Sequence, residues 1–257
     1  MAYKPLKLWF DRELASKIGN QIVSIEPSFP AKQFEENVGK QIDDLELKDR
    51  VEVFADQIGQ CFNKPFTQVI DVLVSILGPE NEGDTGMFTN YYWIMPIAKY
   101  VEKYGLDDFQ VSMMAIEEIT KRNTGEYAIR PFLKQHRDLT LTQMQTWSKN
   151  ANFHVRRLSS EGLRPRLPWA TKLQIFIDQP QLIVPVLDNL KDDESRYVQK
   201  SVANCINDIL KDNREVGMDL IQSWLSNENS NRRWIIKHAL RNLIKKDDAW
   251  ARRLVSN

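Results

Sequence analysis

Apolar residues spaced three or four positions apart recur through almost the whole 257-residue chain, and this spacing restricts its fold more than any other feature. In the segment 47–62, for example, Val51, Phe54 and Ile58 fall on one face of an α-helix. The segment 65–77 predicts a more buried helix with Pro65 in its first turn. Stretches rich in β-branched residues, such as 181–187, are short and lie between helix breakers. The pattern therefore predicts an all-α protein.

A weak internal repeat predicts how the helices are arranged. Segments that begin at Val155, Val198 and Ile235 align at offsets of 43 and 37 residues, each with a cation two positions later and small or apolar residues next. Periods near 40 are typical of HEAT-like solenoids, in which each unit buries an apolar stripe against its neighbour. We predict one domain over 1–257, built from HEAT-like helical repeats stacked in a curved solenoid with a concave basic face. The row of cations on that face would include Arg157, Lys200 and Lys237.

Charge is divided unequally along a chain whose net charge is zero. Residues 1–130 contain 21 acidic and 14 basic side chains, a net charge of −7, and residues 131–257 contain 14 and 21, a net charge of +7. The stretch 232–253 has eight basic residues against Asp247 and Asp248. This asymmetry suits a protein that presents a basic face to a polyanion, although basic helix faces are also common on ordinary proteins in water.

Composition also indicates the compartment. Two cysteines, Cys61 and Cys205, fit a reducing environment better than a disulfide framework. Charged residues at 11–13 interrupt the N-terminal region, so we expect no signal peptide. The longest apolar run, 69–77, contains Asp71 and is too short to span a bilayer. We expect a cytoplasmic protein without a membrane partner.

Several classes of enzyme are disfavoured by missing motifs. The sequence has no Gly-rich phosphate loop, Walker pattern or GxSxG motif, so we expect no nucleotide cofactor. His136, His154 and His238 lie far apart and lack the spacing of a metal site. We therefore predict neither a metal ion nor another cofactor.

The segment 152–169, NFHVRRLSSEGLRPRLPW, is the most informative for function. It sets four arginines around one acid, Glu161, and ends on Trp169 after Pro168. Guanidinium groups are permanently charged forked donors, which suit a partner rich in phosphates. The four arginines are Arg156, Arg157, Arg164 and Arg166.

Two carboxylates are candidates for chemistry because they lie in otherwise apolar or basic helical segments. Glu126 lies near Thr124 and Arg130, where an ordinary acid at a helix start is the alternative. Asp208 shares a helix face with Asn204, and its alternative is a surface acid. For Trp169, the alternative is a tryptophan that anchors the core.

These motifs resemble a known family. HVRRLSSEGLRPRLPW, with TGEYAIRPF before it and SVANCINDILKD and RRWIIKHALRNLIKK after it, is similar to the AlkC branch of the DNA alkylation repair family. The branch consists of HEAT-like-repeat DNA glycosylases related to AlkD, and the similarity extends from about Leu8 to Leu254. Cys205 departs from the pattern, which has a histidine there. Longer relatives carry an immunoglobulin-like domain at the C-terminus, so we expect this chain to be the shorter form.

The resemblance implies a monofunctional 3-methyladenine DNA glycosylase that acts as a monomer on duplex DNA containing alkylated bases. Its substrates would be cationic N3-alkylated bases, chiefly 3-methyladenine, with 3-methylcytosine as a further candidate. Glu126 and Asp208 would be the catalytic carboxylates, and Trp169 and Arg157 would contact the lesion or its sugar. The residues expected to bind the DNA backbone are Arg156, Arg164, Arg166, Lys200, Arg233, Lys237 and Arg241.

Two alternatives stay open at this point. A non-catalytic HEAT-repeat scaffold that binds DNA or protein would explain the repeat and the charge asymmetry equally well. An AlkD-like enzyme with another range of lesions, such as bulky or 7-alkylated purines, would explain the carboxylates too.

Overall fold

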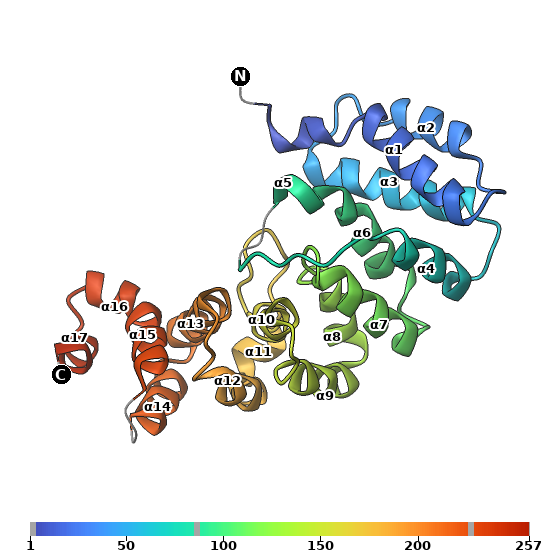
Figure 1. Cartoon of the computed structure of the whole chain (residues 1–257). Helices are drawn as coiled ribbons and strands as arrows, with labels where there is room; N and C mark the ends of the chain where they lie inside the picture. The colour runs from blue at the N-terminus through green and yellow to red at the C-terminus, as the bar shows by residue number, and fades with distance from the viewer. Residues whose placement is uncertain (1–3, 85–87, 226–228, 257) are drawn as a thin grey trace. The chain divides into compact units, whose positions relative to one another are not determined.

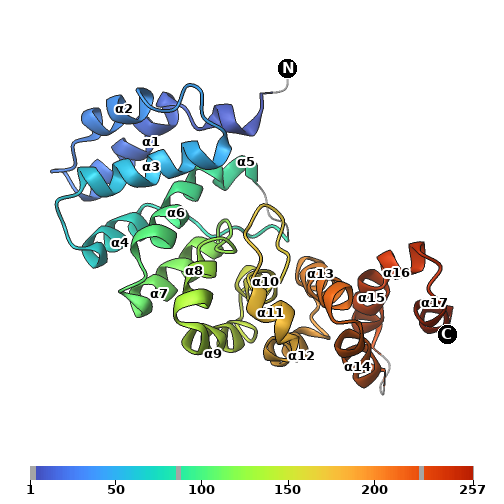
Figure 2. The ribbon, with the colours of Figure 1, turned by 180° about the vertical axis from the view of Figure 1, so that it is seen from behind.

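The computed structural model describes residues 4–84, 88–225 and 229–256, and within these ranges it contains helices and no strand (Figures 1 and 2). The all-α prediction is confirmed. The first α-helices are α1 (Arg12–Ile25), α2 (Ala31–Gly39), α3 (Leu47–Cys61), α4 (Phe66–Ser75), α5 (Phe88–Tyr91), α6 (Met95–Tyr104), α7 (Phe109–Thr120) and α8 (Ile129–Gln135). They are followed by α9 (Arg137–Trp147), α10 (Phe153–Glu161), α11 (Gln174–Asp178), α12 (Val184–Leu190), α13 (Arg196–Asp212), α14 (Arg214–Trp224), α15 (Ser230–Ala239), α16 (Arg241–Lys245) and α17 (Ala249–Ser256). Short 3-10 helices are η1 (Leu6–Trp9), η2 (Tyr92–Ile94) and η3 (Pro180–Leu182).

The predicted helices are present with small shifts at their ends. The segment 47–62 forms α3, and 65–77 forms α4, with Pro65 immediately before its first residue instead of within its first turn. The β-branched stretch 181–187 is helical and lies in η3 and α12. No helix of the described ranges is long and apolar enough to cross a membrane.

The chain divides into two compact units. The first ends at Phe132 and the second begins at Leu133, and both residues belong to α8. Residues 131 and 132 carry no charge, so the acidic and basic portions of the sequence coincide with the first and second units. The single domain predicted over 1–257 stays a prediction.

Paired helices build the first unit. Helix α1 packs on α2, α2 on α3, and α3 on α6, while α7 packs on both α4 and α6. Asp11 caps α1 by accepting a hydrogen bond from the backbone N–H of Leu14. The completely buried rings of Phe10, Phe34 and Phe54 meet edge to face between these helices. Such burial of aromatic rings is a large part of the hydrophobic stabilisation of a helical unit.

The second unit contains the predicted repeat. Helices α10, α13 and α15 pack in that order and lie side by side in both views (Figures 1 and 2). The three residues aligned at the start of the repeat, Val155, Val198 and Ile235, are all completely buried. The cations two positions later are half-buried at Arg157 and exposed at Lys200 and Lys237. The register predicted from sequence therefore matches the burial pattern of three successive helices.

Candidate functional site

Helix α10 and the loop 162–173 after it carry the arginine-rich segment. Asn152 caps α10, because its side-chain oxygen accepts a hydrogen bond from the backbone N–H of His154. Within the loop, the N–H of Leu173 donates to the carbonyl of Pro165, which brings the two ends of the loop together. Hydrogen bonds of this kind and the buried side chains along the loop fix its path over the second unit.

Trp169 lies on the outer part of this loop. Its side chain is 82% exposed, while Leu163, Leu167 and Leu173 of the same loop are buried. Its φ angle of 64° lies in the left-handed region, which costs a non-glycine residue about 1–2 kcal/mol. Trp169 is therefore not a core anchor. A large aromatic ring that is held in a strained conformation and presented to solvent is suited to contact with a ligand.

A buried ion cluster joins the loop to α10 and α13. The Nε of Arg164 donates to Oδ2 of Asp208 at 2.9 Å, and its Nη2 lies 3.4 Å from Oδ1 of the same carboxylate. The Nη1 of Arg164 donates to Oε1 of Glu161 at 2.8 Å. The side chains of Arg164 and Asp208 are only 10% and 11% exposed. Asp208 is thus not an ordinary surface acid, and one arginine holds it in place.

Burial and neighbouring charges perturb both carboxylates. Burial has the largest effect on Asp208 and raises its pKa, against the lowering effect of the bonds from Arg164. Burial also acts to raise the pKa of Glu161, but Arg157 and Arg164 outweigh it and hold that pKa below its ordinary value. A carboxylate that has lost hydration and is fixed by hydrogen bonds interacts strongly with a positive charge beside it.

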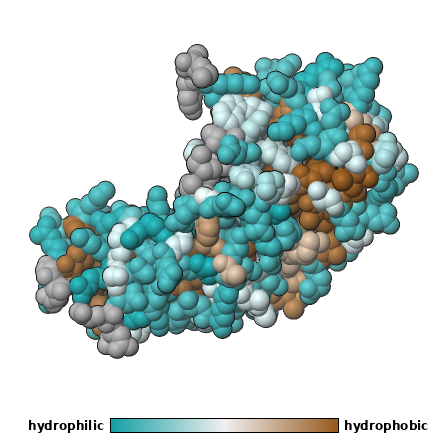
Figure 3. Space-filling view, viewed as in Figure 1, coloured by the Kyte–Doolittle hydropathy of each residue, from teal (hydrophilic) through white to brown (hydrophobic). Residues whose placement is uncertain are grey.

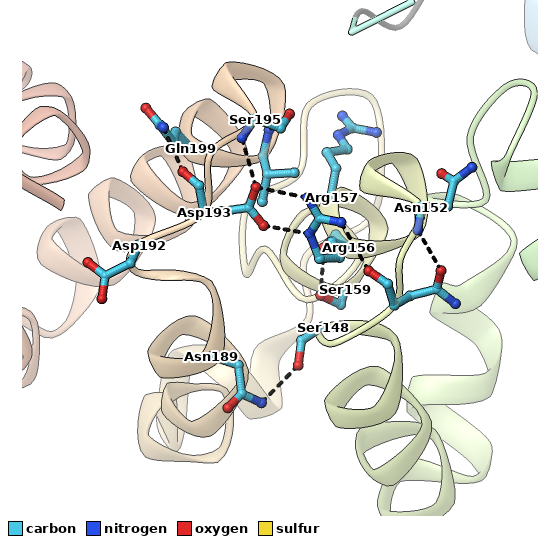
Figure 4. Close-up of polar contacts among 12 residues, drawn as sticks. Ser148, Asn152, Arg156, Arg157, Ser159, Asn189, Asp192, Asp193, Ser195 and Gln199 are labelled. Atoms are coloured by element: carbon cyan, nitrogen blue, oxygen red, sulfur yellow. Dashed lines mark hydrogen bonds and ion pairs between the residues drawn. The ribbon is translucent and has the colours of Figure 1, made fainter. Parts of the chain in front are cut away.

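Arg156 and Arg166 are engaged within the protein. Arg156 forms a bidentate ion pair with Asp193, at 2.6 and 3.1 Å, and Arg166 forms one with Asp212, at 2.6 Å for both bonds. In Figure 4, the guanidinium of Arg156 faces Asp193, whereas the side chain of Arg157 extends from α10 away from that carboxylate. These bonds connect α10 and its loop to the next repeat. Phosphate binding by Arg156, Arg164 and Arg166 stays a prediction, but each guanidinium already has carboxylate partners.

The side chain of Arg157 has other partners than those of Arg156 and Arg166. Its guanidinium carbon lies 5.0 Å from the ring centroid of Tyr197, a cation–π contact, and its Nη2 lies 3.5 Å from Oε1 of Glu161. Arg157 is half-buried and on the same helix as Glu161. The structure therefore brings Arg157 together with the Glu161–Arg164–Asp208 cluster.

Further cations lie along α13, α15 and α16. Lys200, Arg233 and Lys237 are exposed. Arg241 is half-buried, and it donates to the carbonyl of His238 at 2.7 Å and to Oδ1 of Asn204 at 2.8 Å. The visible face of this part of the molecule is mostly hydrophilic (Figure 3). Their predicted contacts with DNA phosphates stay a prediction, and their exposure leaves them accessible to such a partner.

An aromatic stack supports this charged surface. The guanidinium carbon of Arg196 lies 4.1 Å from the ring centroid of Trp234, and the Trp234 and His238 rings are stacked with their centroids 4.8 Å apart. Burial is the largest cause of a lowered pKa for His238, and nearby Arg241 and Lys200 lower it further. The stack orders the surface between α13 and α15.

Glu126 lies in the first unit, in a turn that precedes α8 by three residues. It is half-buried, and its Oε2 accepts a hydrogen bond from the hydroxyl of Thr124 at 3.0 Å, while its own N–H donates to the same hydroxyl oxygen. The contact with Thr124 fixes the carboxylate at the helix start, which fits the ordinary interpretation of this acid as well as a catalytic one.

A further feature of the described residues is how their potential metal ligands and thiols are placed. No group of three or more His, Cys, Asp and Glu side chains there could hold a metal ion. Cys205 is buried, and burial raises the pKa of its thiol well above the ordinary value, which disfavours a reactive thiolate.

Comparisons with known proteins show the family to which this chain is related. The family described as "DNA alkylation repair enzyme" matches residues 107–243. Among the solved structures, the chain is similar to the Pseudomonas fluorescens alkylpurine DNA glycosylase AlkC bound to DNA containing an abasic site analog. The match has a TM-score of 0.89 and 37% sequence identity, and it covers 98% of this chain and 68% of the AlkC chain. The chain belongs to the DNA alkylation repair enzyme family. Its helical-repeat fold is that of AlkC, and the predicted AlkC resemblance is confirmed.

A second relative of this AlkC-like chain is the Bacillus subtilis (strain 168) protein YhaZ, described as uncharacterized. The two are 34% identical over 247 residues, which is 96% of this chain and 66% of YhaZ. The chain thus spans about two thirds of the length of both relatives.

Sequence reasoning did not find the acidic partners of the arginines in this AlkC-like chain. The pairs Arg156–Asp193, Arg164–Asp208 and Arg166–Asp212 are separated by 37, 44 and 46 residues. These separations are close to the repeat length. An arginine followed by an acid about one repeat later was therefore an available signal for ion pairs between successive repeats.

Proposed function

We propose that the protein is a DNA glycosylase that hydrolyses the N-glycosidic bond of cationic N3-alkylated bases, chiefly 3-methyladenine, in duplex DNA. The observation that carries the proposal is the buried carboxylate of Asp208, fixed by Arg164 at the base of the loop that exposes Trp169. The relation to an alkylpurine DNA glycosylase bound to DNA supports it.

Alkylation at a ring nitrogen makes the base cationic, so the base leaves easily and needs little help from a general acid. What limits the reaction is the positive charge that develops on the deoxyribose. A fixed carboxylate about 4 Å from this charge contributes about 4 kcal/mol at an effective dielectric of 20. That energy corresponds to roughly a thousandfold in rate.

We assign this electrostatic role to Asp208, which would also orient the attacking water, as carboxylates do in glycoside hydrolysis. Trp169 would lie against the lesion or its sugar, where a cationic base gains about 0.5–2 kcal/mol from cation–π attraction. Glu126 is kept as a second candidate carboxylate. If it takes part, Glu126→Gln should retain DNA binding and lose most of the release of 3-methyladenine, and full activity of this variant would exclude it. Selectivity would come from the charge and lability of the base more than from hydrogen bonds that read its edge.

The DNA backbone is assigned to the exposed cations Lys200, Arg233 and Lys237, together with Arg241. Arg157 keeps the role that the resemblance implies, a contact with the lesion or its sugar. Arg156, Arg164 and Arg166, which we expected from the sequence to bind the DNA backbone, receive a different main role because each is paired with a carboxylate. We propose that their main work is to hold Asp193, Asp208 and Asp212 and so to fix the loop and α10 on the next repeat. We also propose that the protein acts as a monomer in the cytoplasm.

The test is to incubate the protein with methylated duplex DNA and to identify the freed bases by chromatography. Release of 3-methyladenine is the expected result, and release of 3-methylcytosine would widen the range of substrates. Freed 7-methylguanine alone would instead indicate an AlkD-like range of lesions. If DNA is bound and no base is released, the protein is a scaffold and the proposed activity is wrong.

A further inference from the structure

A chain of charges with alternating sign leads to Asp208. Arg157 lies 3.5 Å from Glu161, Glu161 accepts from Arg164 at 2.8 Å, and Arg164 donates to Asp208 at 2.9 Å. Glu161 lies on α10, Arg164 on the loop, and Asp208 on α13. The side chains of the last three are all nearly buried, so the charges act on one another with little screening by water.

The sharing of Arg164 has an electrostatic consequence. A guanidinium paired with Asp208 alone would neutralise it, and a neutral pair stabilises a developing cation poorly. Because Glu161 takes part of the same guanidinium, the trio of Glu161, Arg164 and Asp208 has a net charge of −1. Arg157 beside Glu161 brings the sum of the four charges to zero, and without Glu161 the remaining three would sum to +1. Arg164 can therefore fix the orientation of Asp208 without cancelling its charge.

We propose that Glu161 is a positioning residue of the reaction, which shares Arg164 with Asp208 and so preserves negative charge at the carboxylate that faces the sugar. The inference rests on the catalytic role proposed for Asp208. Glu161 need not touch the substrate, since it acts through Arg164.

The surroundings of both acids define what a titration would report. Asp208 is influenced by Arg164 and by both the backbone N–H and the guanidinium of Arg166 from the loop. Glu161 from α10 and Arg241 from α16 also act on it, and Cys205 lies on its own helix. Of these charged groups, Glu161 raises the pKa of Asp208, while Arg164 lowers it.

Facing Glu161 are Arg157 from its own helix, Arg164, and the hydroxyl of Ser201 from α13. Removing the charge of Glu161 should therefore lower the pKa of Asp208, whereas removing Arg164 should raise it.

The experiment compares wild type, Glu161→Gln, Arg164→Gln and the double variant in single-turnover release of 3-methyladenine from methylated duplex DNA as a function of pH. In the plot of rate against pH, Glu161→Gln should lower the plateau rate about tenfold or more. It should also move the acid limb, where the rate declines as the pH falls, to lower pH. In parallel, the 13Cγ resonance of Asp208, assigned with Asp208→Asn, should titrate at a lower pH in Glu161→Gln than in wild type. A merely structural role would lower the rate without this downward shift, and that result would overturn the proposal.

Asp192→Asn is the matched control. It removes the carboxylate partner of Arg232, a guanidinium whose side chain is 10% exposed, as is that of Arg164. This variant should lose stability while the plateau rate and the acid limb stay unchanged. A shift of its acid limb like that of Glu161→Gln would contradict the proposal.

Two further comparisons keep the test decisive. If Glu161→Gln does not fold, the acid limb must lie lower in the double variant than in Arg164→Gln, and equal limbs would refute the role of Glu161. If wild type releases no base, the proposed function fails, and the titration of Asp208 still decides the electrostatic claim. A lower pKa in Glu161→Gln then supports the sharing of Arg164, and an unchanged one contradicts it.

Discussion

Arg156→Ala separates a folding role from a DNA-binding role for the arginines of α10. The guanidinium of Arg156 donates to both oxygens of Asp193 and to the carbonyls of Asn150 and Ala151, at 2.6–3.1 Å. The side chains of Arg156 and Asp193 are 22% and 5% exposed. Without Arg156, the carboxylate stays nearly buried and retains a hydrogen bond from the N–H of Ser195. A buried charge without its partner costs about 3–5 kcal/mol, which we reduce to about 2–4 kcal/mol for this remaining bond.

The measurement is the free energy of unfolding in urea for wild type, Arg156→Ala, Asp193→Ala and the double variant. A double-mutant cycle should give a coupling energy of about 1–3 kcal/mol between the two side chains. The salt dependence of DNA binding should be the same in wild type and Arg156→Ala at a temperature where both are folded. A coupling energy near zero, together with a flatter salt dependence, would refute the folding role and restore Arg156 to the phosphate contacts.

Three further predictions concern the exposed and catalytic groups. Trp169→Gly should leave the free energy of unfolding unchanged or raise it by up to about 1 kcal/mol, because glycine relieves the positive φ, while base release slows; a clear loss of stability in urea would contradict the exposed position. Lys200→Ala combined with Lys237→Ala should reduce the slope of log K against log salt by about 2, and an unchanged slope would remove them from the phosphate contacts. In wild type, base release should decline with falling pH at a higher pH than an ordinary aspartate would give, because burial raises the pKa of Asp208 and only its ionised form is active; a rate independent of pH across that range would exclude this requirement.

Much of the fold could be predicted because its signals are local or periodic. The 3.6-residue spacing of apolar residues specifies helices, and Val155, Val198 and Ile235 are buried because they occupy the same position in successive repeats. The division into two units could not be predicted in the same way. It falls within α8, where helical periodicity continues and gives no sign of a boundary.

The sequence predicts which types of residue form the site, but it does not predict which of these residues pair with one another. The segment 152–169 indicates an arginine-rich site, and Asp208 stands out as an acid in an apolar helix. Its burial, however, depends on Arg164, which lies 44 residues earlier and meets it only when successive repeats pack. The exposure of Trp169 depends likewise on the path of its loop, which buried leucines and a left-handed backbone conformation determine.

The most direct test is single-turnover release of 3-methyladenine by Asp208→Asn, with the affinity for DNA measured alongside by fluorescence anisotropy. The change removes the charge and preserves the shape of the side chain. We expect the rate to fall roughly a thousandfold, the value worked out for a carboxylate about 4 Å from the sugar, while the affinity for DNA stays within about threefold. A variant that releases the base at the wild-type rate would contradict the account.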